Sequence, residues 1–240
     1  MAAKVIATAT DKGGAGKTTL TMNLAAYWST VEHRRVLLID CDPTRVLERW
    51  HARGPLKEIP LLGNIDEQTI TSAIDDNLDA YDVILVDCAG SEGQVELFAF
   101  GCANLVLIPA KAAEPDIAAA ARTHLKVKET EKMMNARLRG RDTFTIDTRI
   151  VLTMVSKSTT VARHADKLIR AQPGLIPLGT LLRNLVAFSE STFRGSTPTL
   201  DEPAGAAAYD IRRLAREVGH LVGLPDFQAA AAPAPATAAS

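Results

Sequence analysis

The run Lys12-Gly13-Gly14-Ala15-Gly16-Lys17-Thr18-Thr19 begins just after the apolar stretch Val5 to Thr10, and this order decides which fold to expect. Apolar residues then recur at helical spacing, at Leu20, Leu24 and Trp28. A glycine-rich turn between a strand and a helix lets backbone N–H groups surround an anion at the helix N-terminus. The run therefore predicts a phosphate-binding loop. The structural alternative is a glycine-rich turn that carries surface lysines.

The residue types of this loop predict contacts with a nucleoside triphosphate. We expect Lys17 to contact the β and γ phosphates, the Thr18 hydroxyl to ligate Mg²⁺, and Thr19 to donate to the α phosphate. The loop deviates from the general pattern because Asp11, not glycine, stands five residues before Gly16. The expected nucleotide-binding residues of the loop are Gly13, Gly14, Ala15, Gly16, Lys17, Thr18 and Thr19.

Lys12 is the residue that an ordinary phosphate-binding loop lacks. With it, eight consecutive residues resemble the motif of the ParA/MinD family of deviant Walker ATPases, and weaker similarity extends over roughly residues 3–220. The resemblance implies ATP and Mg²⁺ as ligands and a sandwich dimer of two ATP-loaded chains. It also implies that Lys12 is catalytic and reaches the phosphates of the partner subunit, beside the catalytic Lys17.

Carboxylates stand at the ends of two further apolar stretches. Asp40 ends Val36 to Asp40, with Asp42 close behind, and Asp87 ends Val83 to Asp87 in the Walker B form. Parallel strands deliver such residues to one edge of a sheet, where they can serve a magnesium site. The alternative for Asp87 is an aspartate that caps the next helix.

The segment Asp40-Cys41-Asp42-Pro43 resembles the switch segment of the ParA family. The resemblance implies that Asp40 supports the magnesium shell, with Thr18 and Asp87, and that Asp42 positions the attacking water. Thr44 and Arg45 replace the glutamine-glycine pair of the family, so we expect the switch to behave differently. Glu114-Pro115-Asp116 resembles the strand-to-helix turn of the family beside the dimer interface.

The alternation of apolar and helical patterns predicts a doubly wound α/β fold with a mostly parallel sheet and helices on both faces. Residues 1–228 are expected to form one domain, and the Ala/Pro-rich residues 229–240 a disordered tail. The expected strands are Val5 to Thr10, Val36 to Asp40, Val83 to Asp87, Leu105 to Pro109, Ile150 to Met154 and Leu178 to Leu182. The expected helices are Thr18 to Thr30, Arg45 to Ala52, Glu67 to Leu78, Glu92 to Gly101, Asp116 to Asn135, Thr160 to Gln172 and Ala204 to Leu221.

Charge is divided unevenly along the chain. Residues 1–120 contain 10 lysines and arginines against 17 acidic residues, whereas residues 121–240 contain 17 against 11. The basic half could contact a phosphate backbone, although solvated helix faces explain it equally well, and the family resemblance favours non-specific DNA binding. The candidate basic residues are Arg122, Lys126, Lys128, Lys132, Arg137, Arg139, Arg141, Lys157, Arg163, Lys167, Arg170, Arg212, Arg213 and Arg216.

The three cysteines form no C-x-x-C pair, which argues against a zinc site or a disulfide framework. We find no apolar run long enough to span a bilayer and no basic amphipathic tail. The expectation is a cytoplasmic protein without membrane attachment, associated with the nucleoid.

The family resemblance places the base of ATP near Arg183, which follows the last expected strand. It also implies a homodimer and a separate cargo-linked adaptor or activator protein. The leading interpretation is an ATPase whose ATP-bound dimer binds DNA and positions or segregates cargo. One alternative is an ATP-dependent recruitment protein, for example in conjugative DNA transfer, for which DNA contact is incidental. Another is a metabolic phosphate-loop ligase.

Overall fold

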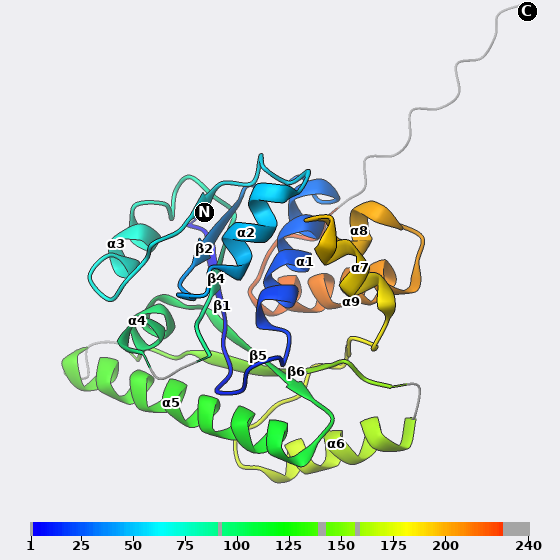
Figure 1. The fold of residues 1–240 in the computed structure, drawn as a ribbon. Coiled ribbons are helices and arrows are strands. Elements are labelled where there is room, and N and C mark those ends of the chain that lie inside the picture. Colours follow the sequence, from blue (N-terminus) through cyan, green and yellow to red (C-terminus); the bar gives the residue numbers. More distant parts are fainter. Residues whose placement is uncertain (1, 91–92, 139–142, 157–158, 228–240) are drawn as a thin grey trace, which may run out of the picture.

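The sheet of the protein has six parallel strands in the order β3-β2-β4-β1-β5-β6. The computed structural model describes residues 2–90, 93–138, 143–156 and 159–227. This arrangement confirms the predicted α/β fold class (Figure 1). The strands are β1 (Lys4–Thr8), β2 (Val36–Asp40), β3 (Leu61–Leu62), β4 (Val83–Asp87), β5 (Leu105–Lys111) and β6 (Asp147–Thr153).

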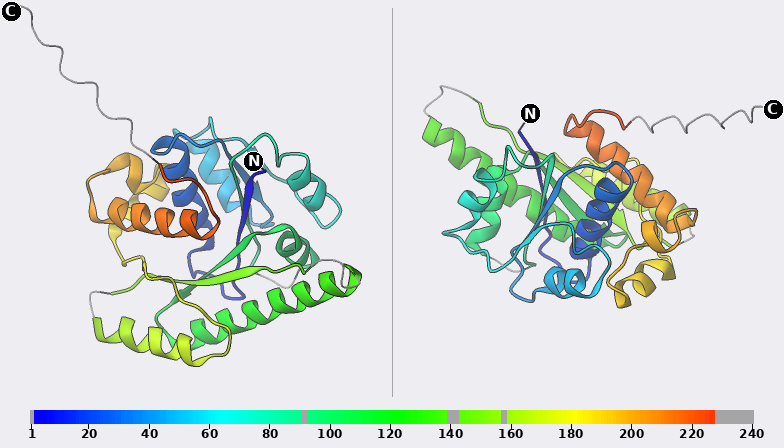
Figure 2. Two further views of the ribbon diagram at one scale, coloured as in Figure 1. Left: turned by 180° about the vertical axis from the view of Figure 1, so that it is seen from behind. Right: turned by 90° about the horizontal axis from the view of Figure 1, so that it is seen from above.

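Helices cover both faces of the sheet because its central strands are apolar on both sides. In β1, Val5 and Ala7 belong to one buried cluster and Ile6 to the other. The Val5 side packs against α3 (Ile70–Asp75), α4 (Gln94–Cys102), α5 (Glu114–Leu138) and α6 (Thr159–Ala171). The Ile6 side packs against α1 (Lys17–Thr30), α2 (Val46–Arg53), α7 (Val186–Phe193), α8 (Pro198–Asp201) and α9 (Ala206–Leu221). Figure 2 shows the two layers from behind and from above.

The predicted strand Leu178 to Leu182 is wrong, although this segment lies beside β6. It makes two isolated parallel bridges, which join Pro177 to Ile150 and Arg183 to Val155. Between the bridges, the N–H groups of Gly179 and Thr180 donate to the carboxylate of Glu217 on α9, at 2.7 and 2.8 Å. Since a side chain takes these donors, no continuous ladder forms.

Other boundaries differ from the expected ones for local reasons. Helix α3 starts at Ile70 instead of Glu67 because the Asp66 carboxylate accepts from the N–H groups of Gln68 and Thr69 and holds them in a turn. Strand β1 ends at Thr8, two residues before its expected end, and the sequence analysis did not predict β3, α7 or α8. Glu92, Arg139, Arg141, Lys157 and the tail 229–240 lie outside the described residues.

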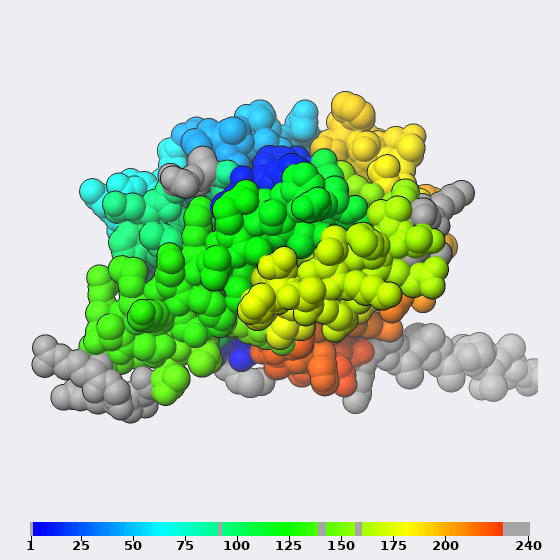
Figure 3. Space-filling view, turned by 90° about the horizontal axis from the view of Figure 1, so that it is seen from below, coloured from blue at the N-terminus to red at the C-terminus, as the bar shows by residue number. Residues whose placement is uncertain are grey.

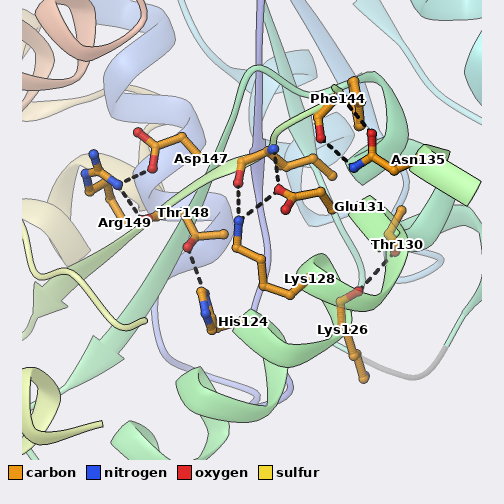
Figure 4. Close-up of polar contacts among 11 residues, drawn as sticks. His124, Lys126, Lys128, Thr130, Glu131, Asn135, Phe144, Asp147, Thr148 and Arg149 are labelled. Atoms are coloured by element: carbon orange, nitrogen blue, oxygen red, sulfur yellow. Dashed lines mark hydrogen bonds and ion pairs between the residues drawn. The ribbon is translucent and has the colours of Figure 1, made fainter. Parts of the chain in front are cut away.

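Helix α5 is tied to the segment that leads into β6 (Figure 4). Lys128 Nζ donates to Ile146 O at 2.9 Å and to Glu131 Oε2 at 2.8 Å, and the same carboxylate accepts from Ile146 N at 2.6 Å. The Asn135 amide pairs with the backbone N–H and C=O of Phe144. These bonds fix the position of α5, which lies beside α6 on the face seen in Figure 3. Among the described residues, no helix has the length and apolar character needed to cross a membrane.

Replacement of Ile6 by alanine should lower the free energy of unfolding by about 3 to 4 kcal/mol, because a fully buried isoleucine at the sheet centre leaves a cavity. Leu125→Ala on α5, where the leucine is 59% exposed, should cost less than about 0.5 kcal/mol. Urea unfolding followed by circular dichroism measures both. Equal losses for the two variants would contradict the assigned core.

Candidate active site

The candidate site lies at the carboxyl edge of the three central strands. Thr8 of β1 pairs in register with Asp87 of β4, and Asp87 pairs with Asp40 of β2. The loop of residues 9–16 continues from β1 into α1 at the same edge. The predicted phosphate loop and the predicted carboxylates are therefore neighbours, as expected for ligand sites of parallel sheets.

The loop has the backbone geometry of an anion cradle. Gly14 and Gly16 adopt left-handed conformations, with φ of 71° and 99°, which favour glycine. Gly16 is the N-cap of α1, and no side chain caps the helix and no acidic residue lies in its first turn. The Thr153 hydroxyl donates to Ala15 O at 2.7 Å and braces the loop from β6. Uncapped N–H groups at a helix N-terminus attract an anion.

Lys17 is buried at the start of α1, with 8% of its surface exposed. Its ammonium group lies against Gly90 in the loop after β4, where a Cβ atom would come within 2.9 Å of Nζ. Gly90 thus leaves room for the lysine. A buried cation is costly without a counter-charge, so this position suits a bound anion.

Asp87 is fully buried and offers one free oxygen. Its Oδ1 accepts from Thr8 Oγ1 at 3.3 Å and from Thr21 Oγ1 at 3.5 Å, whereas Oδ2 has no hydrogen-bond partner among the described residues. Burial raises the pKa of Asp87 to about 7, and the nearby Thr18 hydroxyl opposes this rise. The structure thus places Thr18 and Asp87 together.

This donor set fits Mg²⁺, which keeps several waters and takes only one or two protein carboxylates beside the phosphates. An unpaired buried carboxylate oxygen and an adjacent hydroxyl are oxygen donors of the required kind. Within the described part of the chain, no group of three His, Cys, Asp or Glu side chains gathers to hold a metal. The metal would therefore depend on bound phosphate for the rest of its shell.

Asp40 has a different arrangement from Asp87. Its Oδ1 accepts from Asp42 N and its Oδ2 from Glu48 N, both at 3.0 Å. Burial raises its pKa, and these two backbone bonds oppose the rise. Both oxygens are engaged by backbone donors, so Asp40 fixes the start of α2. Its place in a magnesium shell stays a prediction.

Asp42 lies half-buried before α2, where its Oδ1 accepts from the N–H of Thr44 at 2.8 Å and from its hydroxyl at 2.6 Å. Asp40 and Asp42 face a cavity of about 620 Å³. The cavity has space for water between Asp42 and the loop that follows β4, where Ala89 lines it. Its other lining residues include Arg45, Glu48, Asn64, Asp66, Ala89, Gly93 and Glu96.

Lys12 is held within its own chain. Its Nζ lies 2.5 Å from Asp116 Oδ2 at the start of α5, and Asp116 is 3% exposed with its Oδ1 unpaired among the described residues. The sequence pattern at Asp116 predicts a turn but does not predict this ion pair. The two residues are 104 positions apart, and no sequence signal joins them.

Asp11, the unusual first residue of the loop, is also bound to α5. Its carboxylate lies 2.7 Å from Lys126 Nζ and 3.5 Å from Arg122 Nε, and its N–H donates to Thr123 Oγ1. Lys126 lies 3.9 Å from the buried Glu96 of α4 as well. Lys126 and Arg122 were candidates for DNA contact, and the structure uses them to position the loop.

Arg183 borders a pocket of about 180 Å³ beside the loop, together with Gly16 and Thr19. Its guanidinium pairs with Asp210 of α9, with distances of 2.7 and 2.8 Å, and donates to Ala206 O. Arg183 thus lies beside the loop, but its guanidinium is engaged within the chain, and its contact with a base stays a prediction. The remaining lining includes Met154, Asn184, Leu185, Phe188, Ser189 and Thr192.

Of the other basic candidates, Lys167 and Arg170 are exposed on α6, and Arg213 and Arg216 are exposed on α9. Arg170 pairs with Asp166 at 2.9 Å. Lys128 is engaged inside the α5 network described above. Lys132 and Arg137 are exposed on α5, so the described basic candidates divide among exposed positions on α5, α6 and α9 and ion pairs within the chain.

Comparisons of the sequence and of the structure with known proteins indicate the same family. Residues 6–198 match the model of the CobQ/CobB/MinD/ParA nucleotide binding domain. The chain is 30% identical over 242 residues to the chromosome-partitioning ATPase Soj of Thermus thermophilus, which covers 89% of this chain and 94% of that protein. It is 28% identical to an uncharacterized protein of Mycobacterium tuberculosis, with 92% and 80% covered. A solved complex of a Cyanothece McdA variant with ATP has the same fold, with a TM-score of 0.72, 17% identity, and 95% and 99% covered.

Replacement of Glu96 by glutamine should stabilise the nucleotide-free protein above neutral pH. Burial raises the pKa of Glu96 from 4.5 to about 7, against the lowering effect of Lys126. Between these values the folded protein keeps a proton that the unfolded chain has lost, so the free energy of unfolding falls as pH rises through this window. The gain of Glu96→Gln over the native protein should therefore grow by about 3 kcal/mol from pH 4.5 to about pH 8.

Urea unfolding at the two pH values measures this gain. Glu58→Gln, at an exposed position before β3, is the matched control and should show no growth. A gain for Glu96→Gln that stays constant with pH would contradict the raised pKa.

Proposed function

Because the chain belongs to the CobQ/CobB/MinD/ParA family of nucleotide-binding domains, we propose that it is an ATP-driven switch that positions or segregates DNA or protein cargo. ATP·Mg²⁺ binding forms a homodimer, the dimer binds DNA without sequence preference, and hydrolysis releases it. The observation that carries the proposal is that the uncapped N-terminus of α1 and the buried Lys17 lie at the same edge of the sheet as the unpaired oxygen of Asp87.

The triphosphate lies over the loop in this scheme. Backbone N–H groups of residues 13–19 and the Lys17 ammonium bind the phosphate oxygens. The Thr18 hydroxyl and Asp87 hold Mg²⁺, which neutralises charge on the phosphates. The base occupies the pocket beside Gly16 and Thr19, where Met154 and Phe188 provide apolar surface. The solved complex of McdA with ATP supports this choice of nucleotide, because the two chains share the fold.

Hydrolysis depends on positioning. Asp42 orients the attacking water in the cavity that it shares with Asp40. Lys12 of one subunit stabilises charge on the phosphates bound by the other, in the manner of an arginine finger. To reach them, Lys12 must leave Asp116 of its own chain, so the 2.5 Å ion pair holds the nucleotide-free chain in a form that cannot complete the partner site.

In this scheme, exposed basic residues of α5, α6 and α9 contact the DNA backbone. Contacts to phosphates carry no sequence information and weaken with salt. The name of Soj, a chromosome-partitioning ATPase, supports DNA as the molecule that the protein binds or segregates. A separate adaptor protein linked to the cargo would accelerate hydrolysis, and the protein would act in the cytoplasm at the nucleoid.

Asp42→Ala should leave ATP binding within about threefold of the native protein and slow turnover by roughly 10² or more, because it removes the group that orients water. Asp76→Ala, at the exposed end of α3, is the matched control and should hydrolyse ATP normally. Calorimetric ATP titration and phosphate release measure the two quantities. Unchanged turnover in Asp42→Ala would remove this residue from the mechanism.

Random-sequence duplex DNA should bind with ATP·Mg²⁺, but not with ADP or without nucleotide, and affinity should fall steeply between roughly 50 and 200 mM salt. Lys12→Ala should bind ATP but lose dimerisation and DNA binding, whereas Lys57→Ala, an exposed lysine after α2, should keep both. Asp42→Ala prolongs the ATP state for the assay. Dimerisation without DNA binding would favour the recruitment protein, and loss of both would favour the metabolic ligase.

A further inference from the structure

Helix α2 joins the candidate active site to a distant part of the fold. At its start, Glu48 N donates to Asp40 Oδ2 at 3.0 Å, and Asp42 O accepts from Arg45 N at 2.8 Å. At its end, the indole of the fully buried Trp50 donates from Nε1 to Ser196 O at 3.0 Å. The helix, which lies between the two regions in Figure 1, therefore connects the Asp40 carboxylate and the Asp42 backbone to the turn between α7 and α8.

Where the end of α2 contacts the α7–α8 turn, there is no room for one backbone to shift against the other. A Cβ atom on Gly54 would come within 1.7 Å of Gly195 O, and a Cβ atom on Gly195 would come within 2.8 Å of Trp50 O. Gly195 has φ of 65°, in the left-handed region. The two backbones touch directly, so a shift of the α7–α8 turn must displace the end of α2.

The α7–α8 turn also forms one rigid unit with α7. The carboxylate of Asp201 accepts from the hydroxyls of Ser191 and Ser196 and from Arg194, all at 2.7 Å. Ser191 lies on α7, and Ser196 is the residue whose carbonyl receives Trp50. Through this network, a movement of α7 shifts Ser196 and therefore the Trp50 indole that donates to it.

Helix α7 also forms a wall of the pocket beside Gly16 and Thr19. Phe188, Ser189 and Thr192 line that pocket from α7. Occupation of the pocket by a base acts on α7 directly. A continuous series of contacts thus runs from the base-side pocket through α7, Ser196, Trp50 and α2 to Asp40.

We propose that Trp50 is a positioning residue that couples base occupancy to the placement of Asp40 and Asp42. A polyphosphate without a base then occupies the loop but does not change the placement of Asp40 and Asp42. A nucleotide, which has a base, both occupies the loop and changes that placement. This inference rests on the proposed ATPase function and adds to it the route by which the base is sensed.

Trp50→Phe tests the route kinetically, because phenylalanine keeps an aromatic ring in the core but removes the Nε1 donor. We expect kcat for ATP to fall about tenfold, the effect of one lost hydrogen bond on the active arrangement, with KM within about threefold. Trp28→Phe is a matched control, since Trp28 is also fully buried but its Nε1 has no partner among the described residues. Its kcat and KM should stay within about twofold of the native values.

Fluorescence of the Trp28→Phe variant tests the route without any change at Trp50. The chain has two tryptophans, so Trp50 is the single emitter in this variant. Saturating Mg·ATP should change its emission, whereas saturating magnesium tripolyphosphate, which lacks a base, should not. Calorimetry verifies that each ligand is bound.

Two results would overturn the proposal: equal emission changes with both ligands, or kinetic equality of Trp50→Phe and Trp28→Phe. If Trp50→Phe does not fold, the fluorescence comparison still decides, since it uses the native residue. Absence of ATP hydrolysis by the native protein would instead refute the proposed function, and a base-dependent emission change would remain interpretable on its own.

Discussion

The buried carboxylate of Asp87 is the constraint on which the candidate site depends. It sits at the end of β4 between β1 and β2, fully enclosed, with one oxygen satisfied by Thr8 and Thr21 and the other unpaired among the described residues. An unpaired oxygen in this position costs stability, and a cation or a proton relieves the cost. The uncapped start of α1, the buried Lys17 and the space left by Gly90 are arranged around the same point. Binding of a cation at the unpaired oxygen of Asp87 and of an anion at Lys17 therefore removes an electrostatic cost that the fold itself creates.

Helix α5 provides a second level of control over the loop. Adjacent loop residues of opposite charge, Asp11 and Lys12, pair with opposite charges on α5, at Lys126 and Asp116. Since α5 is itself fixed to β6 through Lys128 and its partners, the loop is positioned by a rigid element. The pairing also explains why the loop tolerates an aspartate where glycine is usual: the carboxylate points to α5.

The sequence was sufficient to predict the parallel α/β fold and the meeting of the glycine-rich loop with the strand-end aspartates, because these depend on local patterns and on the rule that parallel strands end at one edge. It was insufficient for the ion pairs of Lys12 and Asp11, since each joins residues more than 100 positions apart. The two-residue strand β3 has no periodicity to detect. The expected strand at Leu178 to Leu182 failed because Glu217, on a helix that had itself been predicted, captures its backbone donors.

The segment from Leu178 to Leu182, whose backbone donors bind Glu217, affects how copies of the protein can assemble. It lies along β6 through its two bridges and so occupies one edge of the sheet, while the other edge, in the part of the chain that the structure describes, consists of the two residues of β3. Long, open edges are what allow chains to add to one another strand by strand, and short or covered edges prevent it. The sheet of this protein is closed to such growth at both sides, so ordered filaments or aggregates built by sheet extension are disfavoured. Contacts between copies must form through helices and loops, which can be made and broken as their ligands change.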